Sequence, residues 1–447
     1  MYSQIYRTLR LGWPGGLTTR RRLQELSETQ WLSKTELDAY QFSNLRHIIH
    51  YAYEKVPYYR KSFSELGIHP TDIEKLEDIH YLPFLTRDDI NKNLETLVSV
   101  DYQGRVLKNL TGGSTGTPMK FFIDESFWWW NAALEFRGRS WYGVKEGEKI
   151  AWIWGAPQEM RTRSFKARLR SSLMRYRYLN TFDMNENRMQ DFAEELISWK
   201  PAMIRGYVSA LTLFAEFIKH NNFTGIKPKL IETTAEVLDI NQREAIEEVF
   251  DCPVVDCYSA RELGTISYQC EYISRHISET RYVEIINGGR SVPQGELGEV
   301  VITSLTQYSM PLIRYKIDDM GIIDCDECSC KRGLPILREI IGKKLGILVT
   351  SDGRYVYGSY FSTLLQKIED VKRYQVHQYT KEEIVVRLIC KKRLSEDTVI
   401  NIQRKIKEHF GESTDISIVQ ENEIELTPAG KHQFVVSDVE PDFSRSR

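Results

Sequence analysis

The sequence predicts an α/β protein with two parts: a large N-terminal domain of layered β-sheets with flanking helices, and a small, mobile C-terminal α+β domain. Two observations carry this prediction. Between residues 200 and 260, short apolar runs typical of buried strands alternate with helical patterns, as in sheets covered by helices. After about residue 340, the pattern changes to half-exposed strands around one amphipathic helix. We therefore expect domains at residues 1–341 and 342–447.

The N-terminal elements are expected in the following order. Helical spacing of apolar residues covers 23–65, and Thr86 is a suitable N-cap for a short helix with acidic residues in its first turn. Strands are expected at 105–110, 119–123 and 150–155. Strand and helix then alternate, with strands at 203–207, 229–236 and 252–259 and helices at 209–219 and 240–250.

Ligands of such sheets lie at the carboxyl ends of the strands. The polar residues that follow the last three strands are Gly206–Tyr207, Thr234–Glu236 and Tyr258–Glu262. We expect these segments to lie side by side and to form part of the site.

The C-terminal domain begins near the stretch IIGKKLG, where Gly342 and Gly346 bracket two lysines. VKRYQVHQY, EEIVVRLIC and DISIVQ alternate like half-exposed strands. A helix is expected at 395–410, with Ser395 as its cap and apolar residues at helical spacing.

Composition excludes several classes of function. The 447 residues are 41% hydrophobic with a formal net charge of −2, which gives no global reason to expect nucleic-acid binding. No apolar run approaches the ~20 residues that span a bilayer, and the basic segment 1–22 lacks the apolar core of a secretory signal. This segment either packs on the body or contacts a membrane surface. Seven cysteines without a signal predict a cytoplasmic protein.

Residues 109–122 read NLTGGSTGTPMKFF, a run of small and hydroxyl residues between two apolar segments. Small residues let backbone N–H groups approach anionic oxygens, and Lys120 would add positive charge. The stretch is not a Walker loop, because no glycine immediately precedes Lys120 and a strand is expected next. Taken alone, an ordinary Gly/Ser/Thr hairpin is the more frequent explanation.

Five stretches in order resemble the signature motifs of adenylate-forming enzymes, the superfamily of acyl-CoA synthetases, luciferase and peptide-synthetase adenylation domains. They are TGGSTGTPMK (111–120), TTAEVL (233–238), CYSARELG (257–264), LIRYKIDDMG (312–321) and LTPAGK (426–431). STGTPMKFF, RGYVSALTLFAEF, the Arg-Glu pair of SARELG and CSCKRGLPILREIIG resemble more closely the phenylacetate–coenzyme A ligase-like family, in particular its capsular-polysaccharide, CapK-like branch. The resemblance implies activation of a small carboxylic acid by ATP as an acyl-adenylate, with release of pyrophosphate.

The resemblance also implies roles for single residues. Glu262 would hold Mg²⁺, Tyr258 would stack on adenine, and Lys431 would reach the charge that develops between the carboxylate and the α-phosphate. With Glu262 and Lys431, Lys120 completes the expected catalytic set. Asp319, or Asp318 beside it, would bind the ribose hydroxyls. The nucleotide-binding set is Thr111, Gly112, Gly113, Ser114, Thr115, Gly116, Thr117, Ala235, Glu236, Tyr258, Ser259, Asp319 and Lys343. Without the motifs, Tyr258 would be interpreted as a core aromatic residue, and Glu262 and Lys431 as solvated charges.

One departure concerns the family's hinge, which begins Gly-Arg and carries an acidic residue soon after. Here the sequence is Gly342-Lys343-Lys344-Leu345-Gly346. Lysine keeps the charge but lacks the bidentate fork of arginine, and the acidic residue is absent. The flanking glycines still permit the rotation that the family's C-terminal domain undergoes.

Four soft ligands form a second constellation. Cys270 and His276 precede the pair Cys328 and Cys330 by about fifty residues, a set that suits a closed, tetrahedral, structural Zn²⁺ site. Ordinary buried thiols are the alternative. Cys325 would be the spare thiol.

Several questions stay open at this stage. The acyl acceptor is either coenzyme A, the usual acceptor of the family, or an amine, hydroxyl or carrier thiol, as on a sugar. A non-catalytic, nucleotide-binding scaffold of a polysaccharide assembly complex is the alternative function, and no motif of a glycosyltransferase is present. The aromatic runs at 127–131 and 141–143 are either core or the lining of an acyl pocket. A homodimer is one alternative for the assembly.

Overall fold

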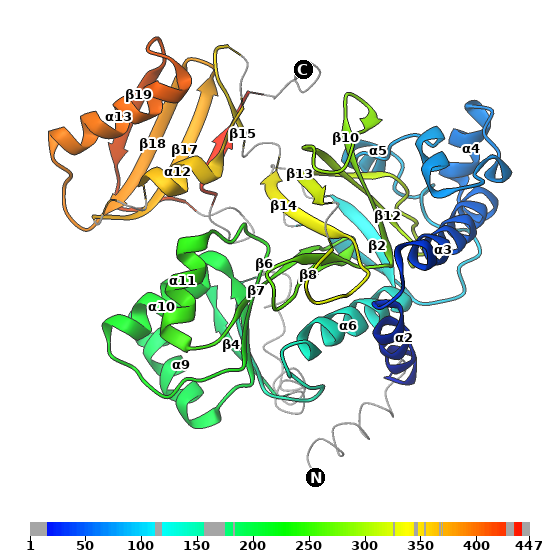
Figure 1. The fold of residues 1–447 in the computed structure, drawn as a ribbon, viewed down its shortest axis with the longest axis horizontal. Coiled ribbons are helices and arrows are strands. Elements are labelled where there is room, and N and C mark those ends of the chain that lie inside the picture. Colours follow the sequence, from blue (N-terminus) through cyan, green and yellow to red (C-terminus); the bar gives the residue numbers. More distant parts are fainter. Residues whose placement is uncertain are drawn as a thin grey trace.

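A computed structural model describes residues 16–111, 119–155, 175–181, 184–324, 327–343, 347–352, 355–365, 368, 370–425 and 433–439. Within them, a twelve-stranded mixed sheet forms the centre of the molecule (Figure 1). Its strand order is β11-β10-β12-β13-β14-β9-β8-β7-β6-β5-β3-β4. The predicted α/β class is therefore confirmed, with one large sheet that combines a parallel half and an antiparallel half.

Five neighbouring strands are parallel: β4 (Tyr176–Asn180), β3 (Ile150–Trp154), β5 (Met203–Tyr207), β6 (Leu230–Thr234) and β7 (Val254–Ala260). One face packs against α9 (Glu186–Trp199), α10 (Val208–His220) and α11 (Ile240–Phe250), which share a core with Ile153, Ile204 and Ile231. The other face carries Arg205 and Glu232, which contact α6 (Glu125–Ser140). Helices thus cover both faces, as expected for buried parallel strands.

The remaining strands pair antiparallel: β8 (Gly264–Gln269), β9 (Arg275–Ile277), β14 (Ile336–Lys343), β13 (Tyr315–Asp324), β12 (Gly298–Ser304), β10 (Arg281–Asn287) and β11 (Arg290–Ser291). The hairpin of β1 (Val106–Leu110) and β2 (Lys120–Asp124) packs on this half. β1 and β2 confirm the two strands expected on either side of the glycine-rich stretch. β3, β5, β6 and β7 likewise confirm the other strands expected in the N-terminal part.

The expected helical region 23–65 is divided into α2 (Gly16–Thr29), α3 (Lys34–Lys55) and α4 (Pro57–Glu65). Ser33 and Glu36 form a capping box that starts α3, and Pro57 occupies the first turn of α4. A capping box satisfies the first N–H groups of a new helix, and proline is tolerated at a helix start but not in its interior. The prediction that this region is helical is confirmed. The capping box and the proline determine where it divides into separate helices. Thr86 caps the next helix, α5 (Arg87–Lys92), as expected.

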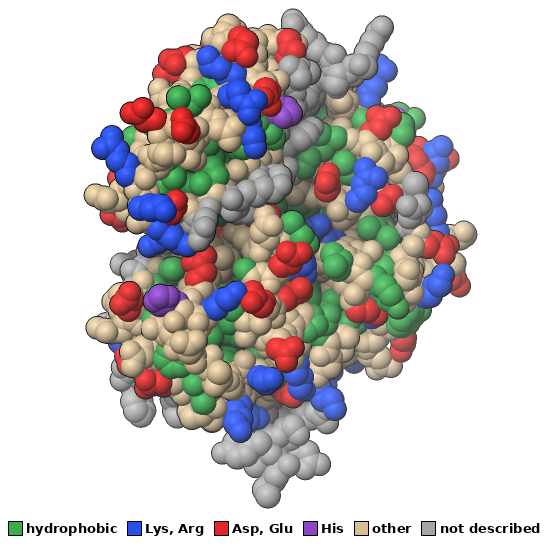
Figure 2. Space-filling model, turned by 60° about the vertical axis from the view of Figure 1, so that its left-hand side comes forward, with side chains coloured by type: hydrophobic (Ala, Val, Ile, Leu, Met, Phe, Trp, Pro, Cys, Tyr) green, Lys and Arg blue, Asp and Glu red, His purple; other side chains and the backbone are tan. Residues whose placement is uncertain are grey.

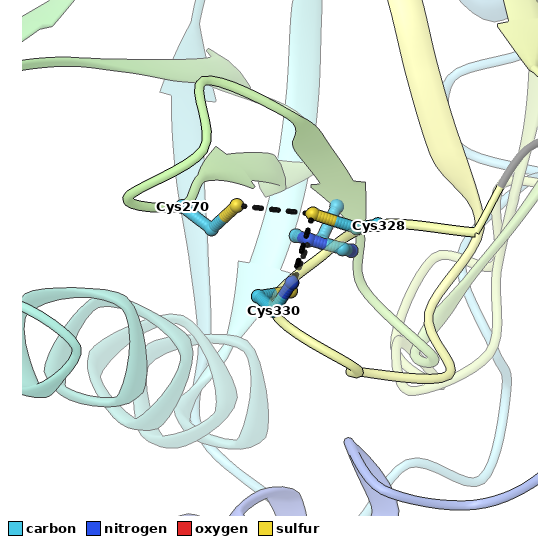
Figure 3. Close-up of side chains that lie close together, drawn as sticks. Cys270, Cys328 and Cys330 are labelled. Atoms are coloured by element: carbon cyan, nitrogen blue, oxygen red, sulfur yellow. Dashed lines mark hydrogen bonds between the residues drawn. The ribbon is translucent and has the colours of Figure 1, made fainter.

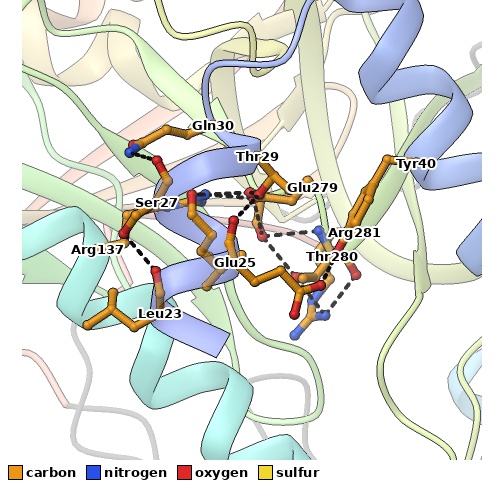
Figure 4. Close-up of polar contacts among 12 residues, drawn as sticks. Leu23, Glu25, Ser27, Thr29, Gln30, Tyr40, Arg137, Glu279, Thr280 and Arg281 are labelled. Atoms are coloured by element: carbon orange, nitrogen blue, oxygen red, sulfur yellow. Dashed lines mark hydrogen bonds and ion pairs between the residues drawn. The ribbon is translucent and has the colours of Figure 1, made fainter. Parts of the chain in front are cut away.

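A buried ion pair fastens the N-terminal helices to the sheet (Figure 4). Arg137 of α6 contacts Glu279 through N–O distances of 2.6 and 2.8 Å, and Thr29 of α2 donates to the same carboxylate. Gln41 of α3 donates to the carbonyls of Glu279 and Arg281. Within the basic segment, the Arg22 guanidinium lies over the ring of Trp130 and Arg20 approaches Glu146, so its described part packs on the body; residues 1–15 lie outside the described residues.

The C-terminal region has its own four-stranded sheet, in the order β19 (Asp415–Gln420), β18 (Glu383–Cys390), β17 (Val371–Thr380) and β20 (Val435–Ser437). Helices α12 (Gly358–Leu365) and α13 (Glu396–Phe410), with the short pair β15 (Ile347–Val349) and β16 (Tyr355–Tyr357), complete it. Ser395 caps α13 as expected. The large sheet ends at Lys343 and the C-terminal core begins at Leu348. The domain boundary at 341/342 and the mobility of this domain stay predictions.

Acidic and basic side chains are interspersed on the face of the molecule that Figure 2 presents, in agreement with the balanced composition. Among the described helices, none has the length and apolar character needed to cross a bilayer.

Candidate functional site

The polar segments after β5, β6 and β7 do lie side by side. The hydroxyls of Thr234 and Ser259 are 3.0 Å apart. Glu236 accepts hydrogen bonds from the backbone N–H and the hydroxyl of Ser209, at 2.7 and 3.0 Å. This carboxylate caps the start of α10, whose N-cap Tyr207 offers no side-chain cap. Ala235 between them has φ of +71°, a left-handed conformation unusual for alanine and frequent at functional turns.

The glycine-rich stretch closes the β1–β2 hairpin. Thr111 is buried and ties the base of the loop, because its N–H donates to the Met119 carbonyl and its hydroxyl accepts from the Met119 N–H, both at 2.9 Å. Arg87 donates to the same hydroxyl at 3.0 Å. Lys120 is the first residue of β2 and is exposed. The predicted residues Gly112 to Thr117 lie outside the described residues.

Glu262 lies in the interior beside this hairpin. The residue is 5% exposed, and its carboxylate accepts a hydrogen bond of 2.9 Å from Tyr315. Tyr315 also contacts the Met119 sulfur, at 3.7 Å. Burial and the neighbouring Glu262 raise the pKa of Tyr315 well above its usual value, so the phenol remains a proton donor. A buried carboxylate is thereby held next to the base of the candidate phosphate loop.

Tyr258 and Asp319 form a second pair. The Tyr258 hydroxyl donates to Asp319 Oδ2 at 2.7 Å, and burial together with this carboxylate raises the pKa of Tyr258 well above its usual value. Asp319 lies opposite Lys343 in the register of β13 and β14. The register with β12 shifts across this segment, and Asp318 has φ of +67°. Such bulges re-aim side chains next to sites, here at the two candidate ribose-binding carboxylates.

Two buried arginines near these pairs were not among the predicted site residues. Arg281 donates to the carbonyl of Leu263, the residue after Glu262, and burial lowers the pKa of this guanidinium to about 10. Arg314 precedes Tyr315 and pairs with Glu284 at 2.9 Å. Both guanidinium groups therefore hold the backbone that carries Glu262 and Tyr315. Arg314 belongs to the recognised Arg-Tyr motif, whereas Arg281 and Arg87 stand in no motif that could have revealed them.

All four predicted metal ligands lie together, and Figure 3 shows the three cysteines among them. The sulfurs of Cys270 and Cys328 are 3.5 Å apart, and Cys330 Sγ lies 3.1 Å from His276 Nε2. All four candidate ligand atoms lie within 4.8 Å of one another. Cys325, the predicted spare, lies outside the described residues.

Several contacts around this cluster favour metal-binding forms of its side chains, although burial raises the pKa of the Cys270 thiol to about 12. Backbone N–H groups of Tyr272 and Cys330 donate to the sulfurs of Cys270 and Cys328, at 3.4 and 3.5 Å, and such bonds stabilise thiolates. His276 Nδ1 lies 3.3 Å from the Leu334 carbonyl, which places the proton there and leaves Nε2 as a ligand. Burial also lowers the pKa of His276 to about 4, so the imidazole is neutral at neutral pH.

Two further predicted residues are described only in part or not at all. The backbone of Lys343 ends β14, but its side chain lies outside the description. Lys431 lies outside the described residues. Their roles, like those of all the site residues, stay predictions.

Comparisons with known proteins show which proteins this chain resembles. Residues 348–438 match the family model of the CapK C-terminal domain. Protein CapK of Staphylococcus aureus is 24% identical over 81% of this chain and 81% of its own length. Phenylacetate-coenzyme A ligase of Thermus thermophilus is 24% identical over 92% of this chain and 98% of its own. A crystal structure of 2-hydroxyisobutyryl-CoA ligase with 2-HIB-AMP superposes with a TM-score of 0.75 at 20% identity, over 91% of this chain and 90% of that chain.

The chain is thus similar in sequence to phenylacetate-coenzyme A ligases and to CapK over most of its length, and it shares its fold with the solved 2-hydroxyisobutyryl-CoA ligase.

Proposed function

We propose that the protein is an AMP-forming ligase that uses ATP to activate a carboxylic acid as an acyl-adenylate and then transfers the acyl group. The observation that carries this proposal is the presence of two carboxylate–tyrosine pairs, the buried pair of Glu262 with Tyr315 and the half-buried pair of Asp319 with Tyr258. The first pair adjoins the hairpin loop, and the second adjoins the strand that ends at Lys343. One bound nucleotide would place its phosphates near the first pair and its ribose near the second.

The chemistry joins two anions, so positioning and positive charge dominate catalysis. The loop from Thr111 to Lys120 would hold the outer phosphates of ATP, with Lys120 supplying charge. Asp319 would accept hydrogen bonds from the ribose hydroxyls, and Tyr258 would orient that carboxylate while its ring faces adenine. Lys431 would stabilise the charge that develops between the acid and the α-phosphate.

Glu262 fits a magnesium site. Mg²⁺ prefers one or two carboxylates together with phosphate oxygens, and this carboxylate is buried beside the loop with one oxygen oriented by Tyr315. When bound, the ion would neutralise phosphate charge. Arg281 would act as a positioning residue, because it fixes the carbonyl directly after Glu262.

The Cys270, His276, Cys328 and Cys330 cluster fits a structural Zn²⁺. Three sulfurs and one imidazole are the ligands of a closed tetrahedral site, and the N–H groups directed at two sulfurs support their thiolate forms. We expect about one zinc per chain in protein purified without chelator. A content well below one would contradict the assignment.

Coenzyme A is the acceptor that we favour, because the ligases among the relatives carry it in their names. An amine or hydroxyl on a sugar, or a carrier thiol, is the second candidate, and a role in polysaccharide biosynthesis rests on the CapK match alone.

The proposal is tested by carboxylate-dependent exchange of pyrophosphate into ATP, with mass spectrometry of acyl-AMP across aromatic, short-chain and amino acids. Glu262→Gln and Lys431→Ala should each abolish most of the exchange. Glu248→Gln is the matched control, since Glu248 pairs with Lys219 on the exposed surface. Unchanged adenylate formation in Lys431→Ala would refute the role of that lysine.

A non-catalytic, nucleotide-binding scaffold is the second candidate, favoured by the altered hinge Gly342-Lys343-Lys344. Calorimetry with ATP separates the two functions. Binding without exchange on any acid would support the scaffold, and exchange with one acid would exclude it.

A further inference from the structure

A basic cavity lies at the opposite end of the parallel strands from the candidate active site. It has a volume of about 330 Å³ and is lined by Glu148, Lys149, Arg175, Lys200, Pro201, Ala202, Lys227 and Lys229. These residues precede or begin β3 to β6 or follow α9, so the cavity opens at the amino ends of the strands. The polar segments of the active site follow the carboxyl ends, and five-residue strands separate the two by about 17 Å. The proposed ligase reaction therefore does not use this cavity.

Part of the positive charge of the cavity is balanced by partners within the protein. Lys229 pairs with Glu148 at 2.7 Å, and Lys227 pairs with Asp251 at 3.4 Å. The C-terminus of α9 attracts cations through its partial negative charge, and Lys149 donates to the carbonyl of Trp199 in its last turn at 2.7 Å. A carbonyl positions a cation but does not neutralise it.

Two lysines are not neutralised in this way. Among the ion pairs of the described residues, none joins Lys149 or Lys200 to a carboxylate. Lys200 caps α9 with φ of +52° and is followed by the buried Pro201, so its backbone position at the rim is fixed. Burial, together with the neighbouring cations Arg175, Arg177 and Lys200, lowers the pKa of Lys149. Cations that the fold holds together against their repulsion indicate a place for an anion.

We propose that this cavity binds an anionic ligand that carries phosphate. Its cations come from the start of four strands and the end of one helix, and so surround the hollow, whereas cations along one exposed helix would make only a solvated face. A phosphate at neutral pH carries up to about two negative charges, which matches the charge of Lys149 and Lys200. The volume lies at the lower end of the range for small-molecule sites. A free phosphorylated compound and a phospholipid headgroup share this chemistry.

The experiment measures binding of inorganic pyrophosphate by calorimetry to the full chain and to Lys149→Gln/Lys200→Gln. Since the candidate ATP site also binds phosphates, each protein is titrated in the Glu262→Gln background as well. We expect the affinity of the Lys149→Gln/Lys200→Gln variant for pyrophosphate to fall roughly tenfold or more. Its thermal melting temperature should stay unchanged. Lys149→Arg/Lys200→Arg preserves the charge and should retain binding. Lys219→Gln is the matched control, because this exposed lysine of α10 pairs with Glu248 and is not part of the cavity lining.

A second arm uses phosphatidylcholine vesicles with and without phosphatidic acid. Charge-dependent capture by the acidic vesicles alone, without pyrophosphate binding, would assign the site to a lipid headgroup. Pyrophosphate binding that depends on the two lysines would assign it to a soluble phosphorylated ligand. If neither ligand distinguishes the Gln pair from the original chain, the proposal is wrong. Because acyl-adenylate formation is assayed separately, this result does not depend on the proposed ligase function.

Discussion

The Tyr315 hydroxyl donates a hydrogen bond of 2.9 Å to Glu262 inside the protein, where both side chains are almost fully buried. A carboxylate that is to bind a cation needs one oxygen oriented and the other accessible to the ion. Tyr315 performs the first task without adding charge. The pair therefore joins the Arg-Tyr motif and the aromatic-x-x-x-Glu motif into one part of the candidate site.

Tyr315→Phe should lower kcat/KM for ATP-dependent exchange by roughly tenfold, because one hydrogen bond to a charged group contributes about 1.5 kcal/mol. In a titration with Mg²⁺, the concentration that half-saturates the exchange reaction should rise. Tyr59→Phe is the matched control, since Tyr59 is equally buried and donates to the Pro311 carbonyl. Equal losses in both variants would attribute the effect to stability rather than to Glu262.

Asp319→Asn should weaken ATP binding more than Asp318→Asn, because Asp319 is the carboxylate that Tyr258 orients at 2.7 Å. Calorimetry with ATP checks the order. A double-mutant cycle with Tyr258→Phe should show a coupling energy of about 0.5 kcal/mol or more. The reverse order of the two asparagine variants would transfer the ribose role to Asp318.

Removal of metal should destabilise the protein. Incubation with a chelator, or the substitution Cys328→Ser, should lower the melting temperature by about 5 °C or more, since metal binding contributes directly to folding. Cys252→Ser controls for the loss of a thiol, because Cys252 lies outside the cluster. Melting curves that do not respond to the chelator would indicate ordinary buried thiols.

Glu232 should contribute stability that depends on pH. Burial alone would raise the pKa of this carboxylate, but Arg139 and Arg205 lower it to about 2. A lowered pKa means that the stabilisation is complete above the unfolded value near 4.5 and is lost as the pH falls from there toward 2. Glu232→Gln should cost about 3–5 kcal/mol at pH 7, and urea unfolding should show this difference shrinking below pH 4.5. A difference independent of pH would exclude the charge as its origin.

Local patterns predicted most of the elements. Alternating apolar residues identified β17 and β18, and the capping residues Thr86 and Ser395 marked helix starts that the structure shows. The division of region 23–65 was not predicted, because the apolar spacing continues across Ser33 and Pro57 while the breaks depend on single capping residues.

The candidate site was predictable only where it coincides with motifs. Glu262, Tyr258 and the four metal ligands stand in recognisable short stretches, so the sequence identified them. Arg87 and Arg281 act through long-range contacts with Thr111 and Leu263, and no local spacing marks such contacts. The basic cavity could not be predicted either, because its lysines lie on separate elements and only the parallel register brings them together.

Strand β14 connects two parts of the molecule that the sequence motifs treat separately. At its start, Ile336 pairs with His276 of the metal cluster, and at its end Lys343 lies opposite Asp319. The strand thus starts beside the candidate metal cluster and ends beside the candidate ribose-binding carboxylate. The same chelator that loosens the fold should therefore also reduce affinity for ATP, so the zinc content of a preparation would set its apparent nucleotide affinity.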